Sequence, residues 1–366
     1  MSDASSIAFI GLGLIGGSIA RGIKREQPDT RIMAYMRTRS KLLKAKEDGI
    51  VDTALDGIGE ELRECDLIFL CTPVEHNARY LSEIRPFLKQ GAIITDVGST
   101  KTDIHEEVIR LGMESCFVGG HPMAGSEKAG YENSTDHLLE NAYYIITPTA
   151  ASTEEQTERL VRIARMIGSI PIVLDYHEHD FVTAAISHLP HIIASSLVNL
   201  VKDSDSEQGL MKRLAAGGFK DITRIASSSP EIWEHICMTN TGNLSVILER
   251  YIASLDRILA ELKSKDNQYI RQLFETSRDY RNSLSEKTPG PITPDYSFTV
   301  DMADEVGAIS TLAVILAAKG ISIRNIGINH NREHGEGTLR IAFYEKEAMD
   351  KAWKQLERYH YDLISN

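Results

Sequence analysis

Short apolar runs alternate with helix-like segments over the first 175 residues of the chain. The runs that predict strands cover residues 6–10, 31–36, 67–71, 92–96, 116–118, 143–147 and 171–174. Residues 14–24, which follow the first run and its glycines, have the apolar spacing of a helix. Strands that alternate with helices are typical of a largely parallel sheet with right-handed crossovers. The pattern therefore predicts a doubly wound α/β domain over residues 1–175.

The pattern changes to a helical period between residues 176 and 288, where strand signals are missing. The clearest series of apolar positions is Val246, Leu248, Tyr251, Ile252, Leu255, Ile258, Leu259 and Leu262. We expect an all-helical domain here. Three prolines then fall within residues 289–294, and because proline lacks an N–H group and breaks regular structure, this segment is predicted to be a linker.

The C-terminal segment, residues 296–366, combines both patterns. Strand-like runs cover residues 296–301, 321–328 and 338–344, helix-like runs cover 306–319 and 346–359, and a short strand ends the chain. Gly320 is the expected stop of the first of these helices. The order βαββαβ is typical of a ferredoxin-like module. The predicted fold class is therefore α/β, with a Rossmann-type domain, a helical domain and a small C-terminal sheet.

Composition and charge exclude several classes of protein. Among the 366 residues, 42% are hydrophobic and 25% charged, which is typical of a globular protein and not of a disordered one. Forty basic and 52 acidic residues give a net charge of −12, which opposes nucleic-acid binding because that needs a concentrated cationic face. The apolar residues 7–23 are interrupted by five glycines and Arg21, so no membrane span is expected.

Cysteine usage and the N-terminus both bear on location. The four cysteines are Cys65, Cys71, Cys116 and Cys237, and no two of them form a C-x-x-C motif. We therefore expect neither a disulfide framework nor a zinc knuckle, and a reducing cytoplasm is the expected location. The first residues carry an acid where a signal peptide carries bases.

A glycine-rich motif follows the first predicted strand and opens the first predicted helix. Its residues are Gly11, Leu12, Gly13, Leu14, Ile15 and Gly16, which match G-x-G-x-x-G. In this setting Gly11 permits the tight turn, Gly13 permits close approach of a pyrophosphate, and Gly16 permits helix–strand packing. The motif predicts a dinucleotide site at the N-terminus of the helix. Thr72, Pro73 and Ser99 are further expected cofactor contacts.

The second predicted strand ends without the acid that usually accepts the ribose hydroxyls of NAD. The residues there are Met36-Arg37-Thr38-Arg39. An arginine at this place usually binds a 2′-phosphate, which favours NADP, whereas an Arg37 that stacks on adenine or stays solvated would allow NAD. The residues alone leave NAD and NADP open.

Two further motifs follow predicted strands, at the sheet edge where ligands bind in open α/β folds. They are residues 96–101 (DVGSTK) and 119–127 (GGHPMAGSE). His121 can accept a proton from a substrate hydroxyl near neutral pH, and the Ser99 hydroxyl can share that hydrogen-bond network. A structural role for His121 in a loop is the alternative.

The predicted helical domain carries two more candidate groups. His188 and His191 lie three residues apart, on one face of a helix if Pro190 only kinks it, and no third metal ligand follows at a supporting spacing. We expect no metal. Arg224 stands in an apolar stretch, where a desolvated guanidinium needs a carboxylate from Asp221, from Glu127 or from a substrate.

Five motifs in this order resemble those of bacterial prephenate dehydrogenases. They are GLGLIGGS, DVGSTK, GGHPMAGSEKAG, SHLPH and GGFKDITRIASSSPEIW, between residues 11 and 233. The resemblance implies oxidative decarboxylation of prephenate to 4-hydroxyphenylpyruvate, with NAD as the usual cofactor and a homodimer built through the helical domain. It implies that His121 takes the proton of the ring hydroxyl with help from Ser99. It also implies substrate contacts from Arg224 and His191, and we add His188, Asp221 and Glu127 to these.

The C-terminal segment resembles the ACT domains found in Gram-positive members of that family. This likeness implies an amino-acid effector, for which L-tyrosine is the natural candidate. The expected effector contacts are Asp304, Val306, Gly307 and Asn325. A module with only a structural role is the alternative.

Three other functions compete with this interpretation. A β-hydroxyacid-type dehydrogenase would share the layout and would rely on a lysine such as Lys220 in the helical domain. Arogenate differs from prephenate by an amino group, and the residues do not distinguish the two substrates. A sensor that binds nicotinamide and an amino acid without catalysis would leave His121 dispensable.

Overall fold

The computed structural model describes residues 6–73, 76–125, 128–286, 296–302, 307–330 and 337–365. The chain forms two compact units, Met1–Tyr280 and Arg281–Asn366, and each is described by itself. The proposed linker at residues 289–294 lies outside the described residues.

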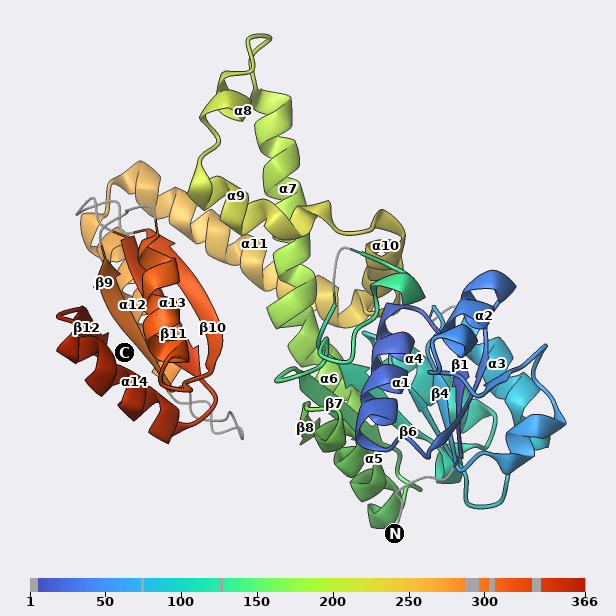
Figure 1. The fold of residues 1–366 in the computed structure, drawn as a ribbon. Helices are drawn as coiled ribbons and strands as arrows, with labels where there is room; N and C mark the ends of the chain where they lie inside the picture. The colour runs from blue at the N-terminus through green and yellow to red at the C-terminus, as the bar shows by residue number, and fades with distance from the viewer. Residues whose placement is uncertain are drawn as a thin grey trace. The chain divides into compact units, whose positions relative to one another are not determined.

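A five-stranded parallel sheet lies at the centre of the N-terminal part of the first unit, with helices packed around it (Figure 1). Its strands are β1 (Ser6–Ile10), β2 (Arg31–Tyr35), β3 (Thr53–Ala54), β4 (Leu67–Leu70) and β5 (Ile93–Asp96), in the order β3-β2-β1-β4-β5. The connecting helices are α1 (Leu14–Glu26), α2 (Arg39–Glu47), α3 (Asn77–Ile84) and α4 (Thr102–Arg110). The chain leaves β1 toward β2 on one side and reaches β4 on the other. The crevice at the carboxyl ends of β1 and β4 is therefore the topological switch point.

Alternate residues of the central strands enter two separate cores, one on each face of the sheet. Phe9 and Phe69 belong to one core and stack with ring centroids 4.9 Å apart. Ile10 and Leu70 belong to the other. Because both faces are covered, these strands are nearly continuous apolar runs, which is why their positions could be predicted from the sequence.

A second, three-stranded sheet extends the first. Its strands are β6 (Val118–Pro122), β7 (Tyr143–Pro148) and β8 (Ile170–Val173), with β6 antiparallel to β7 and β7 parallel to β8. A parallel bridge between Ile94 and Phe117 joins it to β5. α5 (Glu154–Met166) begins with a capping box of Thr153 and Gln156.

The predicted strand at residues 116–118 is displaced, because the strand that forms begins two residues later. Cys116 ends a 3₁₀ turn (Glu114–Cys116), and the strand runs through Val118–Pro122. Two glycines and a proline give this segment little intrinsic preference for a strand, so it is the pairing with β7 that makes it one. Further 3₁₀ turns cover Glu60–Glu64, Arg85–Phe87 and Tyr131–Asn133.

The rest of the first unit is helical, as predicted. Its elements are α6 (Tyr176–Thr183), a π-helical turn η6 (Ala184–His188), α7 (Leu189–Ser204), α8 (Leu210–Leu214), α9 (Gly217–Thr223), a 3₁₀ turn η7 (Arg224–Ser227), α10 (Pro230–Thr239), α11 (Thr241–Ser264) and α12 (Asn267–Glu286). The run Tyr176–Ser204 is long and apolar enough to cross a membrane, a test that core helices of soluble proteins also pass. Many of its apolar side chains are exposed in the single chain, for example Ile186 and Leu200.

The second unit has the predicted order of elements. They are β9 (Tyr296–Met302), α13 (Ala308–Ala317), β10 (Ile323–His330), β11 (Gly337–Phe343), α14 (Lys346–Arg358) and β12 (Asp362–Ser365), and the antiparallel sheet has the order β10-β11-β9-β12. Phe298 and Val300 lie two residues apart on β9 and share one core with Leu312 of α13 and Leu356 of α14. Both helices therefore cover the same face of the sheet.

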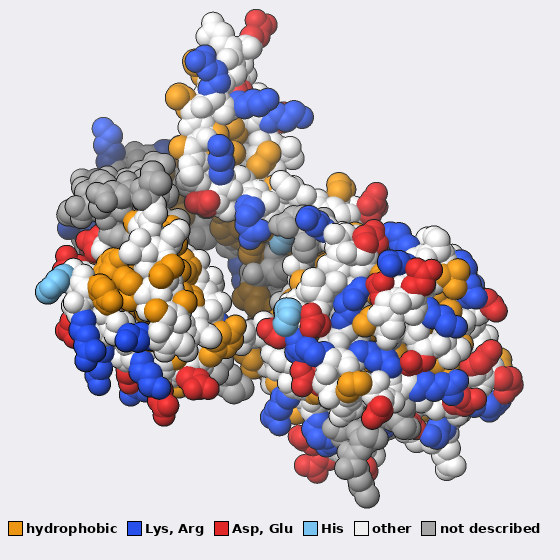
Figure 2. Space-filling view, in the orientation of Figure 1, with side chains coloured by type: hydrophobic (Ala, Val, Ile, Leu, Met, Phe, Trp, Pro, Cys, Tyr) orange, Lys and Arg blue, Asp and Glu red, His pale blue; other side chains and the backbone are white. Residues whose placement is uncertain are grey.

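Charged side chains of both signs are interspersed on the surface shown in Figure 2, over the N-terminal part of the first unit. Apolar side chains gather on the C-terminal unit in the same view. Exposed apolar residues of that unit include Val314, Tyr344, Tyr359 and Ile364.

Candidate active site

The glycine loop between β1 and α1 has the geometry of a phosphate cradle. Gly11 has φ +89°, and a Cβ atom there would lie 2.6 Å from the main-chain oxygen of Cys71. A Cβ at Gly16 would lie 2.8 Å from the main-chain oxygen of Gly11, whereas nothing lies within 4 Å of one at Gly13. No side chain caps α1, and its first turn contains no acid. The N–H groups of this helix end are thus available to an anion, which fits the pyrophosphate of a dinucleotide.

A cavity of about 170 Å³ lies at this loop, over the carboxyl ends of β1, β2 and β4. It is lined by Gly11, Leu12, Gly13, Tyr35, Met36, Arg37, Thr38, Cys71, Thr72, Pro73, His76 and Tyr80. The predicted contacts Arg37, Thr72 and Pro73 are among them. Arg37 is exposed, and Leu14, Ile15 and Gly16 instead form the first turn of α1.

A buried ion pair holds the loop that follows β5. The ammonium of Lys101 pairs with the carboxylate of Asp96, and both side chains are almost completely buried. Lys101 Nζ also donates to the main-chain oxygen of Gly120 at 2.8 Å, and Asp96 accepts from the N–H groups of Gly98 (2.8 Å) and Gly120 (3.1 Å). Burial lowers the pKa of Lys101, and Asp96 opposes that change. These contacts fix the loop that carries Ser99 against β6.

His121 lies within β6 and not in a loop after it, which corrects the sequence prediction. Its Nδ1 is hydrogen-bonded to Nε2 of His179 at 2.8 Å. Nδ1 of His179 is in turn hydrogen-bonded to Oδ1 of Asp180 at 2.8 Å. His179 and Asp180 are fully buried, and His121 is 9% exposed. The pairing of β6 with β7 holds His121 on a rigid strand.

The environment keeps His121 neutral and Asp180 charged. Burial, assisted by His179 and Lys101, lowers the pKa of His121 well below its ordinary value. Burial alone would raise the pKa of Asp180, but hydrogen bonds from His179 and Thr102 outweigh it and lower that pKa to about 2. A neutral imidazole can accept a proton, so His121 meets the first requirement of a general base.

The π-helical turn brings His188 into the same site. Its Nδ1 lies 3.2 Å from Nδ2 of Asn240, which also donates to the main-chain oxygen of Asp180 at 2.7 Å. Burial lowers the pKa of His188 to about 4, and its charge would further lower the pKa of His121. The predicted kink at Pro190 takes the form of this turn, with Pro190 in the first turn of α7.

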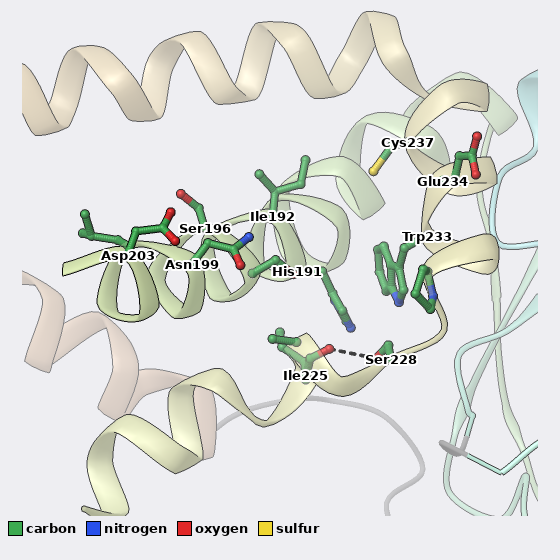
Figure 3. Close-up of a pocket in the computed structure, with 14 residues that line it drawn as sticks. His191, Ile192, Ser196, Asn199, Asp203, Ile225, Ser228, Trp233, Glu234 and Cys237 are labelled. Carbon is green, nitrogen blue, oxygen red and sulfur yellow. Dashed lines mark hydrogen bonds between the residues drawn. The ribbon is translucent and has the colours of Figure 1, made fainter. Parts of the chain in front are cut away.

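His191 lies against the indole of Trp233, as Figure 3 shows. The two rings stack with centroids 3.5 Å apart, and His188 meets the same indole edge-on at 6.0 Å. Burial lowers the pKa of His191, and Arg224 lies near enough to lower it further. These side chains line or adjoin a cavity of about 910 Å³ between α7, η7 and α10. The site therefore continues from His121 past His188 and His191 toward Arg224.

The structure leaves the roles of four predicted residues untested. Arg224 is exposed in the single chain, whereas the sequence suggested a desolvated guanidinium, because it lies on a short surface turn. Asp221 is also exposed, and Ser99 is half-buried. Glu127 lies outside the described residues. The roles of Arg224, Asp221 and Ser99 in catalysis or substrate binding stay predictions.

Several site residues were missed by the sequence analysis. They are His179, Asp180, Trp233 and Asn240, together with the pairing of Lys101 and Asp96. The run of titratable side chains in residues 177–180 (HEHD) was the available signal. Among the described residues, no group of three or more His, Cys, Asp or Glu is arranged to hold a metal ion.

Two of the predicted effector contacts are described in the second unit. Gly307 has φ +93° and precedes α13. Asn325 is exposed on β10, beside an irregularity in its pairing with β11. Asp304 and Val306 lie outside the described residues.

Comparisons with known proteins agree with this layout. Residues 19–172 match the family described as "Prephenate dehydrogenase, nucleotide-binding domain", and residues 175–276 match "Prephenate dehydrogenase, dimerization domain". A prephenate dehydrogenase of Bacillus subtilis is 38% identical over 96% of this chain and 95% of its own length.

Two solved structures are similar to about three quarters of this chain. Prephenate dehydrogenase from A. aeolicus, in complex with hydroxyphenyl propionate and NAD⁺, has a TM-score of 0.72 and 28% identity, covering 77% of this chain and 98% of that chain. Synechocystis arogenate dehydrogenase has a TM-score of 0.69 and 30% identity, covering 76% of this chain and 99% of that chain.

Proposed function

The chain belongs to the prephenate dehydrogenase family, and on that premise we propose that it converts prephenate to 4-hydroxyphenylpyruvate with NAD as the hydride acceptor, in L-tyrosine biosynthesis. The observation that carries this proposal is His121. It is a buried, neutral histidine in β6, and β6 continues the sheet whose carboxyl edge carries the glycine loop. A proton acceptor and a dinucleotide cradle at one sheet edge are what the oxidation of a ring alcohol requires.

The reaction balances without the release of a proton. The ring carbon that bears the hydroxyl loses hydride, the ring carboxylate leaves as carbon dioxide, and its bonding electrons complete the aromatic ring. Bound NAD supplies the acceptor for the hydride. His121 takes the hydroxyl proton as the carbon becomes electron-poor and returns it to the phenolic oxygen once the ring is aromatic. A positioned base of this kind contributes roughly 10²–10⁴-fold in rate.

Arg224 and His191 are proposed to hold the substrate. Prephenate is a dianion, and the chain has a net charge of −12, so the site needs a local cation to attract it. Arg224 supplies this cation next to His191, on η7 beside the cavity wall formed by Ile225 and Ala226. A guanidinium can bind a carboxylate through two parallel hydrogen bonds.

The test is an assay of the purified protein with prephenate and with arogenate, each combined with NAD or with NADP. We expect reduction of NAD with prephenate. Arogenate is the second candidate substrate, because the chain is similar to an arogenate dehydrogenase. Reduction with arogenate and not with prephenate would show that arogenate is the substrate. Reduction of NADP would show that Arg37 binds a 2′-phosphate, and an Arg37→Gln variant should then lose NADP and keep NAD. No reduction with either substrate would refute the proposal.

We propose that the second unit is an ACT domain that binds L-tyrosine. The order βαββαβ and the sheet order β10-β11-β9-β12 support a ferredoxin-like module. Gly307 and Asn325 are the described members of the expected effector site. A ligand that binds the native state must stabilise it. L-Tyrosine that changes neither activity nor melting temperature at saturation would refute the effector.

We also propose a cytoplasmic homodimer built through the helical region. Ile186, Leu200, Ile252 and Leu259 are apolar and strongly exposed in the single chain. A face of this kind is typical of a subunit interface. Analytical ultracentrifugation should give a mass about twice the 40.7 kDa of one chain, and a monomer at micromolar concentration would contradict the dimer.

A further inference from the structure

His179 and Asp180 form a buried chain of hydrogen bonds behind His121. His121 Nδ1 and His179 Nε2 are 2.8 Å apart, and His179 Nδ1 and Asp180 Oδ1 are also 2.8 Å apart. The rings of His121 and His179 lie at 76° with centroids 5.0 Å apart, so each nitrogen meets its partner edge-on. All three side chains are buried.

Asp180, at the far end of this series of hydrogen bonds, is fixed to the backbone. Oδ1 of Asp180 accepts the N–H of Lys101 and Oδ2 accepts the N–H of Thr102, each at 2.8 Å. These N–H groups belong to the N-terminal end of α4, which also favours a negative charge. The side-chain amide of Asn240 donates a hydrogen bond to the main-chain oxygen of Asp180. Asp180 is therefore an immobile acceptor.

Hydrogen-bond logic then assigns the protons. An ionised carboxylate only accepts, so Nδ1 of His179 carries a proton. In a neutral His179, Nε2 is consequently an acceptor, and Nδ1 of His121 must donate to it. The lone pair of His121 is left on Nε2. A doubly protonated His179 would reverse this order and leave His121 with an Nε2–H group that cannot take a proton.

We propose that His179 and Asp180 are positioning residues that fix the tautomer of His121, so that its Nε2 is the atom that accepts the hydroxyl proton of the substrate. This inference rests on the proposed function, because it assigns an atom to the base of that reaction. When Nε2 takes the proton, Nδ1–H of His121 remains donated to His179, and Asp180 compensates the positive charge through His179. The same nitrogen returns the proton to the phenolic oxygen. The proton therefore does not have to pass through His179 and Asp180 to solvent, which agrees with the burial of both side chains.

Two substitutions of His179 separate tautomer control from packing. In His179→Gln the amide oxygen can still accept from Nδ1–H of His121, whereas His179→Phe keeps a ring and offers no acceptor. In Ser–His–Asp triads a reversed tautomer costs about 10⁴-fold in kcat. We expect His179→Phe to lower kcat with prephenate by about 10²-fold or more and His179→Gln by less than about tenfold, with KM and the dissociation constant of NAD within about threefold for both.

His105→Phe is the matched control. His105 is a fully buried histidine on α4 that bonds Thr147 and stacks on Tyr176, and neither of these contacts involves His121, His179 or Asp180. Its replacement reports what the loss of a buried imidazole does to melting temperature, and we expect it to leave kcat within about threefold. A large loss of kcat in His105→Phe, equal to that in His179→Phe, would refute a specific role for His179.

Nitrogen NMR of the wild-type protein labelled at histidine tests the tautomer without turnover. We expect His121 to show a protonated Nδ1 and a bare Nε2 in the resting protein, with the two exchanged in His179→Phe. A wild-type His121 protonated at Nε2 would overturn the inference, as would a His179→Gln variant that folds normally and is as slow as His179→Phe. A wild-type protein that has the expected tautomer and does not oxidise prephenate would instead contradict the proposed function alone.

Discussion

Removal of the ammonium of Lys101 should lower the free energy of unfolding more than the same substitution at a surface lysine. Lys101→Met replaces a fully buried cation that pairs with Asp96 and donates to the main-chain oxygen of Gly120. The methionine keeps most of the volume. Among the described residues, the donors that remain to Asp96 are then the N–H groups of Gly98 and Gly120, at 2.8 and 3.1 Å.

The expected cost follows from the burial of both groups. Breaking a buried ion pair by removing one partner costs about 3–5 kcal/mol, because the remaining charge is left in a medium of low polarity. Hydrogen bonds to the N–H groups offset part of this cost for Asp96, so we expect about 3 kcal/mol. In a domain of this size that loss corresponds to a fall in melting temperature on the order of 10 °C.

Urea unfolding followed by circular dichroism measures this difference. Lys41→Met is the control, since Lys41 pairs with Glu132 at 2.8 Å on the surface with 42% of its side chain exposed, and such pairs contribute at most about 1 kcal/mol. The double variant Asp96→Asn/Lys101→Met should lose at least about 1 kcal/mol less than the sum of the two single variants. A Lys101→Met variant within about 1 kcal/mol of the wild type would refute the assignment of this pair as a structural anchor.

Three further predictions concern the cofactor, the substrate and pH. Gly11→Ala should raise the dissociation constant of NAD, measured by calorimetry, by at least about tenfold, because its Cβ would lie 2.6 Å from the main-chain oxygen of Cys71 at φ +89°. Gly57→Ala is the control, because nothing lies within 4 Å of a Cβ there. Equal NAD affinities of the Gly11→Ala and Gly57→Ala variants would contradict the role of the glycine loop as a phosphate cradle. Arg224→Ala should raise KM for prephenate by about tenfold or more and change kcat less, and an unchanged KM would contradict a carboxylate contact. The pKa of Asp180 is lowered to about 2 from 3.8, so its ionised form contributes about 2 kcal/mol above about pH 4, and this is lost as the pH falls from about 4 toward 2. The stability gap between wild type and Asp180→Asn should therefore narrow below about pH 4 in urea unfolding, and a gap that does not depend on pH would contradict an ionised Asp180.

The sequence by itself determined the parts of this protein that depend on local periodicity. The strands of the five-stranded sheet, except the two-residue β3, and the βαββαβ order of the second unit follow from apolar spacing and turn residues. The glycine loop is also a local property, because its tight turn and open helix end come from consecutive residues. The place of the dinucleotide site was therefore predictable.

Only the tertiary structure decided which distant side chains meet. His121 and His179 are 58 positions apart, and their contact depends on how β6 pairs with β7 and how α6 packs on the N-terminus of α4. The strand β6 has weak local preference, so its position was mispredicted for the same reason. The physical cause is that pairing across a sheet and packing between helices are set by the whole fold, and periodicity along a single segment does not encode them.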